Sequence, residues 1–526
     1  KPFIEDSAVA ARHARLAGAD IVNVHGAHGQ LPALLFNPVF NKRTDEYGAQ
    51  NFENRCRFAV ELLDAIRREC GNKIAIEYRL SCTDIVEGSP EVEEVIEFAK
   101  TIQDKIDMLL ISRGCLAINK LLPLILPPTY MDHGINNEYA AKFNAALDIP
   151  VGVIGAVTFE QAEEAVASGK VEYVAMCRQN IADPDCVNKA LHGREDDICP
   201  CIRCNTCISR SHFYMKSPRC AANPRYNRGM DYNYMPPITK KKKVAVIGGG
   251  PAGMETARVA ALRGHDVTLF EKSSRLGGKL PLAAMIKGVE VEDVRPVISY
   301  LTTQVGKLNI KVRLGEEATV SKILAEKPDA VVIATGGLYR LPSLKGVENR
   351  NVAGVNSLSK QVKLPLLVFG PELLNKLTKL FLPIGKRVAI IGGQIEGLQG
   401  AVFLRKRGRE VTVLEPSETF GKGIPPRYLD RLKPWLAKKD VQLLGGVTCD
   451  QITDQGVVIT TKDKQRKLIE ADTVMVLLLQ EPDTSLLEAL KGSVKEVLCA
   501  GSVNGAQVGS LIVNAIEDGR RIGCNL

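Results

Sequence analysis

Four cysteines lie close together in the stretch CIRCNTCISRSHFYMKSPRC, residues 201–220, at the spacing C-x2-C-x2-C-x12-C. The four positions are Cys201, Cys204, Cys207 and Cys220. Zinc sites commonly use two separate C-x2-C pairs, whereas three thiolates in one overlapping run can ligate three corners of an iron–sulfur cube. The spacing therefore favours a [4Fe-4S] cluster. Zinc and unligated thiols are the alternatives, and Cys199 is interpreted as a bystander.

A glycine-rich turn follows the cysteines in KVAVIGGGPAGMETARVAALRGHDVTLFEK, between an apolar strand and a helix. Gly248, Gly250 and Gly253 form the pattern G-x-G-x-x-G, and Glu271 ends the next strand. Such glycines permit a tight turn and let a pyrophosphate approach the helix N-terminus, while the acid can accept hydrogen bonds from a ribose. The turn therefore predicts a nucleotide-binding fold.

The same arrangement returns in RVAIIGGQIEGLQGAVFLRKRGREVTVLEP, with Gly392 and Gly397 at the turn and Glu415 at the end of the strand. Gln394 occupies the middle glycine position, where a side chain would crowd a pyrophosphate. NAD(P)H binding and a structural relic therefore both remain open for this turn. Glu415 would repel a 2′-phosphate, which favours NADH over NADPH. The C-terminal residues 497–523 resemble the returning strand and helix of the first copy, so the second copy is interpreted as an insertion.

The region before the cysteines alternates apolar strands with helix-like sequence. Five strands are expected, at residues 19–27, 74–81, 107–114, 151–157 and 173–179. Continuous apolar strands of this kind are typical of parallel sheets covered on both faces, with functional groups at the carboxyl ends of the strands. A closed (β/α)8 barrel needs eight such units, so we expect that the first three strands are missing from this sequence.

Length and composition place the chain among multidomain globular proteins. It has 526 residues, 45% hydrophobic and 25% charged, with a formal net charge of +9. This charge does not require nucleic acid as a partner, and no apolar run reaches the length of a membrane span. Scattered cysteines and the absence of a recognisable leader favour a reducing cytoplasm. We also expect a homo-oligomer, and the lack of an initiating Met suggests truncation.

Several motifs together resemble the iron–sulfur flavoenzymes of old-yellow-enzyme type, which include 2,4-dienoyl-CoA reductases, enoate reductases and trimethylamine dehydrogenases. The motifs are HGAHG (25–29), NPVFNKRTDEYGAQNFENRCRF (37–58), residues 151–185, the cysteine run and GGGPAGMETA. The resemblance implies an α/β protein, with an N-terminally truncated TIM barrel for FMN, a [4Fe-4S] segment and two Rossmann-like domains. The implied boundaries are 1–196 for the barrel, 197–240 for the cluster segment and linker, 241–375 with 490–526 for FAD or ADP, and 376–489 for NAD(P)H.

The resemblance also implies how the barrel residues bind FMN. Arg79 would lie beside the flavin pyrimidine edge, where a cation stabilises the anionic reduced ring. Gly155, Ala156 and Arg178 would hold the phosphate, in keeping with the phosphate site of such barrels. Cys177 replaces the glycine that usually precedes this arginine, a departure that could alter the backbone contact.

His25 and His28 match the pair that binds a substrate carbonyl or carboxylate in this family. Without the resemblance, they could equally be polar residues at the rim of the barrel. Gln30 stands where ene-reductases of the group commonly have a proton-donating tyrosine, and an amide cannot act as a general acid near neutral pH. The proton would then come from His28, Tyr47, Tyr130, His133 or solvent, unless the reaction needs no such acid.

The function that the resemblance implies is an NAD(P)H-dependent ene-reductase. Electrons would pass from NAD(P)H through FAD and the cluster to FMN, and then as hydride to an activated C=C bond of an enoate, enone or enoyl thioester. Ser502 replaces the usual aspartate after Gly501, so ADP alone could replace FAD. One alternative is amine dehydrogenation, although Trp435 is the only tryptophan available for an aromatic cage. The other alternative is a degenerate electron-transfer protein.

Overall fold

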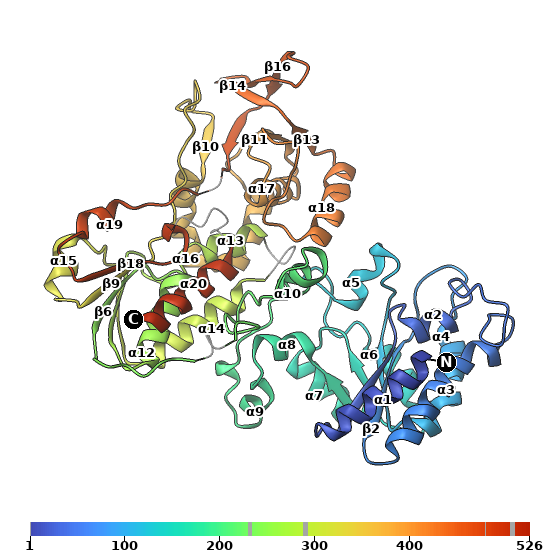
Figure 1. Cartoon of the computed structure of the whole chain (residues 1–526). Coiled ribbons are helices and arrows are strands. Elements are labelled where there is room, and N and C mark those ends of the chain that lie inside the picture. The colour runs from blue at the N-terminus through green and yellow to red at the C-terminus, as the bar shows by residue number, and fades with distance from the viewer. Residues whose placement is uncertain (1, 230–233, 288–292, 479, 505–510) are drawn as a thin grey trace. The chain divides into compact units, whose positions relative to one another are not determined.

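The computed structural model describes residues 2–229, 234–287, 293–478, 480–504 and 511–526. The chain divides into two compact units, Lys1–Arg178 and Gln179–Leu526. In both units, parallel strands alternate with helices (Figure 1), so the predicted α/β fold class is confirmed.

The first unit contains a parallel sheet with the strand order β1-β2-β3-β4-β5, and all five strands coincide with the predicted apolar segments. The strands are β1 (Ile21–Gly26), β2 (Ala75–Ser81), β3 (Met108–Ser112), β4 (Val151–Ile154) and β5 (Tyr173–Ala175). The register sets His25 opposite Arg79, and Ser81 opposite Ser112. Polar residues that are far apart in the sequence therefore meet where these strands end.

Most helices of the first unit bury their apolar faces in one hydrophobic core with the sheet. The 19-residue helix α3 begins at Asn51, whose side chain accepts a hydrogen bond from the backbone N–H of Asn54 at 2.8 Å. It buries Leu62, Leu63 and Ile66. The helices are α1 (Pro2–Leu16), α2 (Leu31–Phe36), α3 (Phe52–Cys70), α4 (Val92–Ile102), α5 (Leu122–Ile125), α6 (Asn137–Asn144), α7 (Phe159–Ala167) and α8 (Cys177–Ala182), which crosses the division between the units.

The second unit contains two five-stranded parallel sheets. The first has the order β18-β9-β6-β7-β8, so a strand from near the C-terminus pairs with strands that follow the cysteine segment. Helices α12 and α20 pack together against this sheet. The elements are β6 (Lys243–Ile247), α12 (Pro251–Leu262), β7 (Asp266–Glu271), α13 (Leu280–Lys287), α14 (Arg295–Gly306), β8 (Ile310–Leu314), α15 (Val320–Ala325), β9 (Ala330–Ile333), α19 (Ser485–Leu490), β18 (Glu496–Cys499) and α20 (Ile512–Asn525).

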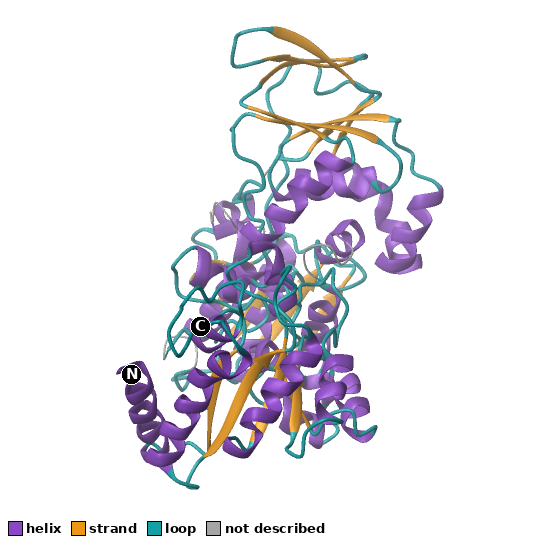
Figure 2. Cartoon of the chain, turned by 90° about the vertical axis from the view of Figure 1, so that its right-hand side faces the viewer, coloured by secondary structure: helices purple, strands orange, loops and turns teal. Residues whose placement is uncertain are grey.

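The second sheet has the order β10-β17-β11-β12-β13, and a small antiparallel sheet of β14-β15-β16 contacts its inner strands β11 and β17; Figure 2 colours the strands orange. Helix α16 connects β10 to β11 and is kinked at Gly370, between Pro365 and Pro371. The elements are β10 (Val352–Gly354), α16 (Val355–Leu380), β11 (Arg387–Ile391), α17 (Ile395–Arg405), β12 (Glu410–Glu415), α18 (Pro426–Lys438), β13 (Gln442–Gly445), β14 (Thr448–Thr453), β15 (Gly456–Thr460), β16 (Arg466–Glu470) and β17 (Thr473–Val476). Across the described ranges, no helix is long and apolar enough to cross a bilayer.

Short helices form the segment between the two kinds of fold. They are α9 (Cys186–Leu191), a 3-10 turn at Glu195–Asp197, α10 (Thr206–Ile208) and a π-helical turn at Ser209–Phe213. Three of the four clustered cysteines lie in or just before these last two turns. This segment belongs to the second compact unit.

Candidate active site

Two histidines and an arginine meet at the carboxyl ends of β1 and β2. The His25 and His28 rings lie edge to face with their centroids 5.1 Å apart. Burial, and then the charge of Arg79, lowers the pKa of His25 to about 4. The same two causes, together with the charge of His25, lower the pKa of His28 to about 2. Both imidazoles are therefore neutral at pH 7 and can donate a hydrogen bond without carrying charge.

Ser112, at the end of β3, fixes the orientation of His28. Its hydroxyl oxygen lies 2.6 Å from His28 Nε2 and accepts a hydrogen bond from Arg79 Nη2 at 3.3 Å. A hydroxyl that accepts from the guanidinium can direct its own proton to the imidazole, which then carries its hydrogen on Nδ1. His28 is only 2% exposed, and its backbone N–H donates to Ser81 Oγ at 2.9 Å.

Three polar atoms near these strand ends are buried without a hydrogen-bond partner among the described residues. They are His25 Nδ1, Arg79 Nε and Arg113 Nε. Burial also lowers the pKa of Arg79. Buried polar atoms are nearly always paired in native proteins, so atoms of this kind call for a polar ligand. A flavin, whose ring and phosphate present oxygen and nitrogen acceptors, fits these donors.

The residues predicted to bind the phosphate follow β4 and β5. Ala156 has a left-handed backbone with φ of 58°, and its carbonyl lies 2.5 Å from His133 Nδ1. A side chain on Gly155 would meet Asn136, which donates to the carbonyl of Ile154 at 2.6 Å. Arg178 lies in the first turn of α8. The role of these three residues at a phosphate stays a prediction.

Gln30 does not join this group as a proton donor. Gln30 is exposed at the start of α2, and its side chain makes no capping hydrogen bond to the helix. Among the alternatives, the Tyr47 hydroxyl donates to Glu61 at 2.6 Å, and this bond is the main cause that raises the pKa of Tyr47 to about 12. Neutral His28 is a poor acid as well. The structure therefore weakens two of the predicted donors.

The cysteine segment shares a hydrophobic core with the first dinucleotide fold. Cys199, Ile202 and Cys204 are buried together with residues of β6, α12 and α20. Tyr428 Oη, on α18, donates to the carbonyl of Arg203 at 2.8 Å. The segment thus contacts both dinucleotide folds within the second unit.

The clustered thiols lie near one another. Burial raises the pKa of Cys220 to about 12, and the neighbouring thiols of Cys201 and Cys207 add to this rise. No three His, Cys, Asp or Glu side chains in the described part of the chain form a site for a single metal ion. The [4Fe-4S] cluster on Cys201, Cys204, Cys207 and Cys220 therefore stays a prediction from their spacing.

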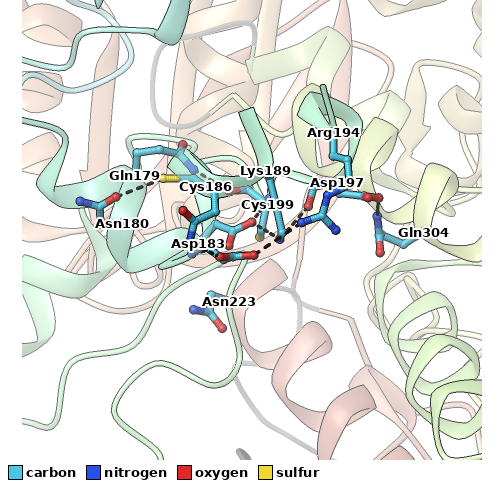
Figure 3. Close-up of polar contacts among 12 residues, drawn as sticks. Gln179, Asn180, Asp183, Cys186, Lys189, Arg194, Asp197, Cys199, Asn223 and Gln304 are labelled. Carbon is cyan, nitrogen blue, oxygen red and sulfur yellow. Dashed lines mark hydrogen bonds and ion pairs between the residues drawn. The ribbon is translucent and has the colours of Figure 1, made fainter. Parts of the chain in front are cut away.

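Hydrogen bonds from α8 and the residue after it hold the backbone where the cysteine segment begins (Figure 3). The Gln179 amide donates to the carbonyl of Cys199 at 2.8 Å and accepts from the N–H of Cys201 at 3.0 Å. Asp183 Oδ2 accepts from the N–H of Cys199 at 2.8 Å and from Lys189 Nζ at 2.6 Å. Sequence reasoning missed these contacts, because they depend on how α8 packs against the segment.

The first glycine-rich turn has the geometry of a nucleotide site. Gly248 has φ of 109°, and a Cβ on Gly253 would lie 1.8 Å from the carbonyl oxygen of Gly248, so only glycine fits there. The Glu271 carboxylate accepts from the N–H of Gly249 at 2.7 Å. At the second turn, Gly392 has φ of 112°, Gly397 makes a similarly close approach, and Glu415 accepts from the N–H of Gly393 at 2.6 Å.

A mostly apolar cavity of about 230 Å³ lies between the two dinucleotide folds of the second unit, lined by α13, α16 and α17. Lys279 stands in its wall, donating to the carbonyl of Gly337 at 2.6 Å and to Gln480 at 2.8 Å. Burial, and then the charge of Lys272, lowers its pKa to about 8. Sequence reasoning missed this cavity. Only the stretch GGKL, residues 277–280 after Glu271, could have indicated it.

Comparisons with known proteins agree with both halves of this description. Residues 1–197 match the model of the NADH:flavin oxidoreductase / NADH oxidase family, and residues 242–497 match that of the pyridine nucleotide-disulphide oxidoreductases. The chain is 31% identical to an NADH oxidase of Thermoanaerobacter brockii, over 91% of this chain and 70% of that protein. It is 28% identical to a cinnamate reductase of Clostridium sporogenes, over 96% and 75% of the two chains. A solved 2-naphthoyl-CoA reductase in complex with 2-naphthoyl-CoA has a TM-score of 0.89 at 33% identity, covering 100% of this chain and 76% of that one.

Proposed function

Because the chain belongs to the NADH:flavin oxidoreductase / NADH oxidase family, we propose that this oxidoreductase is an NAD(P)H-dependent ene-reductase. Its substrate would be an activated C=C bond in an enoate, enone or enoyl thioester. The cinnamate and 2-naphthoyl-CoA reductases among its relatives are named for conjugated carboxylate and thioester compounds. This chemistry supports the choice of an unsaturated carbonyl compound over other oxidants.

One observation carries the proposal: a pair of neutral histidines stands beside a buried arginine. Two neutral imidazole N–H groups can hold a carbonyl or carboxylate oxygen, and this draws electron density from the conjugated double bond. With Ser112 donating to Nε2, His28 would carry its hydrogen on Nδ1, available to such an oxygen. Because the two imidazoles are neutral, the positive charge beside the bound oxygen would come from Arg79. Bound FMN would supply the hydride for the β-carbon.

The remaining cofactors follow from the other sites. We propose a [4Fe-4S] cluster on Cys201, Cys204, Cys207 and Cys220, and FAD, or ADP alone, at the turn of Gly248, Gly250 and Gly253. NAD(P)H would bind at the second fold, with NADH favoured by Glu415. The shared core of the cysteine segment and the first dinucleotide fold supports an electron path between them. The protein's own part is to hold these groups and to exclude water.

The proposal is tested by anaerobic incubation of the protein, reconstituted with flavins, iron and sulfide, with NADH and a panel of cinnamate, cinnamoyl-CoA and cyclohexenone. We expect one NADH oxidised for each double bond lost. His25→Ala should lower this turnover by about 100-fold, because one hydrogen-bond donor to the developing negative charge is lost. His13→Ala, at an exposed position on α1, is the matched control and should leave turnover unchanged. NADH oxidation with no member of the panel reduced would refute the proposal.

Amine dehydrogenases also occur among the relatives. An ammonium substrate would need an aromatic cage. The only tryptophan of the chain, Trp435, lies on α18 in the second unit, where its ring lies 5.9 Å from Lys406 Nζ. Nothing in the described barrel residues favours this alternative over the ene-reductase.

A further inference from the structure

The two glycine-rich turns of the second unit offer an internal comparison. In each copy, the glutamate at the end of the second strand accepts a hydrogen bond from a backbone N–H in the turn. Glu271 accepts from Gly249 at 2.7 Å, and Glu415 accepts from Gly393 at 2.6 Å. In each copy the loop after that acid also returns to the turn. Gly277 N–H donates to the carbonyl of Gly249 at 2.8 Å.

The second copy repeats this last contact, with Gly421 N–H donating to the carbonyl of Gly393 at 2.9 Å. Residues 271–280 and 415–424 therefore correspond one to one. Lys422 takes the place of Gly278, and Gln394 takes the place of Gly250. These two replacements change what lies in front of the helix N-terminus.

At the first turn, two glycines face each other in front of the helix, and a Cβ on Gly278 would lie 2.9 Å from the Cα of Gly250. A Cβ on Gly250 would meet only the Cα of Gly278, at 4.0 Å. The next residue is Pro251, which has no N–H to bond the loop. The two groups that fasten the loop at the second turn, the Gln394 side chain and the Ile395 N–H, therefore have no equivalent at Gly250 and Pro251.

At the second turn, the loop is fastened across the same space. The Gln394 side chain accepts a hydrogen bond from the backbone N–H of Lys422 at 2.8 Å, and its amide donates to the carbonyl of Thr419 at 3.4 Å. The N–H of Ile395, the first residue of α17, donates to the carbonyl of Lys422 at 3.2 Å. The amide that a pyrophosphate would use is thus already occupied by the chain itself.

We propose that Gln394 is a positioning residue that holds residues 416–423 as a closed lid over the dinucleotide site of the second fold, so that NADH binds only after this loop opens. The inference rests on the proposed function in taking NADH as the ligand. It goes further in assigning Gln394 a role as the determinant of NADH affinity.

The lid lowers the apparent affinity by the fraction of molecules in which the loop is open. Removing the Gln394 side chain eliminates the 2.8 Å bond and the weaker 3.4 Å bond. The Ile395 bond remains, because it joins two backbone groups. Loss of about one neutral hydrogen bond from the closed state should raise the open fraction by about fivefold.

The test is calorimetric titration of the FAD-loaded protein with ADP-ribose, which carries the pyrophosphate but no nicotinamide, and with NADH. We expect Gln394→Ala to lower both dissociation constants by about fivefold. Gln394→Gly should lower them further, because it also removes the Cβ. Gln442→Ala, an exposed glutamine on β13 of the same fold, is the matched control and should leave both constants unchanged.

A second readout follows the lid itself. ADP-ribose should speed hydrogen exchange at the N–H of Lys422 in the wild-type protein, because the loop must release Gln394 to admit the ligand. Unchanged dissociation constants in both Gln394 variants, or no binding by any of the proteins, would overturn the inference. Failure of the ene-reductase proposal gives a different result: tight ADP-ribose and NADH binding without reduction of any C=C bond.

Discussion

Replacing Asp183 by Asn removes one charge from the network that holds the start of the cysteine segment. Asp183 is 5% exposed and accepts hydrogen bonds from Lys189 at 2.6 Å and from the N–H of Cys199 at 2.8 Å. Breaking a buried ion pair by removing one partner typically costs about 3–5 kcal/mol. The Lys189 side chain is 19% exposed and keeps a bond to the carbonyl of Asp197 at 3.0 Å. Because Lys189 is partly solvated and keeps one partner, we expect the free energy of unfolding to fall by about 2–3 kcal/mol.

Urea unfolding followed by the fluorescence of Trp435 measures this loss, because the single tryptophan lies in the same compact unit as Asp183. The matched control is Asp266→Asn, which breaks the ion pair between Asp266 and Lys241. That pair has the same 2.6 Å distance, but its side chains are 54% and 58% exposed. Exposed pairs contribute about 0–1 kcal/mol. The reasoning fails if Asp183→Asn is no more destabilising than Asp266→Asn.

Three further predictions concern the turn, the histidines and the flavin. Gly253→Ala would place its Cβ 1.8 Å from the carbonyl oxygen of Gly248, so FAD content after reconstitution should fall to near zero. The control is Gly306→Ala, where the added Cβ meets open space, and this variant should retain its FAD. Equal FAD content in the two variants would contradict the prediction. His28 has its pKa lowered to about 2, so the unfolded state binds more protons below its ordinary value of about 6.5, and stability falls as the pH drops. His28→Asn should reduce that slope by up to about 1.4 kcal/mol per pH unit between pH 6 and 4 in urea titrations, and an unchanged slope would count against burial as the cause. Arg79→Gln should raise the dissociation constant of FMN by at least about tenfold in fluorescence release assays, because a charge-assisted hydrogen bond is lost. Arg79→Lys, which keeps the charge, should recover part of the affinity. Unaltered FMN binding in Arg79→Gln would contradict the assignment.

The five strands of the first unit and the strands beside the two glycine-rich turns could be predicted because each is a short apolar run next to helical sequence. Met108–Ser112 and Ala330–Ile333 are clear examples, since nearly every residue in them is buried. The helix that follows each glycine-rich turn was equally clear from G-x-G-x-x-G and its variant. The kink of α16 at Gly370 and the antiparallel strands β14–β16 were not predicted, since tertiary packing decides both.

The candidate site could be predicted only as far as local motifs reach. His25, His28 and Arg79 lie at strand ends, and parallel strands bring their carboxyl ends together. The role of Ser112 depends on the register of β2 against β3, which the sequence does not reveal. The closed second turn was also hidden: Gln394 indicated crowding, but its bond to Lys422 depends on the conformation of a loop 28 residues farther along the chain.

The most direct test of the central claim is an assay of iron and acid-labile sulfide in the anaerobically purified and reconstituted protein. The spacing and environment of Cys201, Cys204, Cys207 and Cys220 predict about four iron and four sulfide per chain. Cys204→Ser should lose most of both, while Cys449→Ser, a half-buried cysteine on β14, should retain them. A single tightly bound zinc per chain without sulfide, or equal iron content in Cys204→Ser and the wild-type protein, would contradict the account.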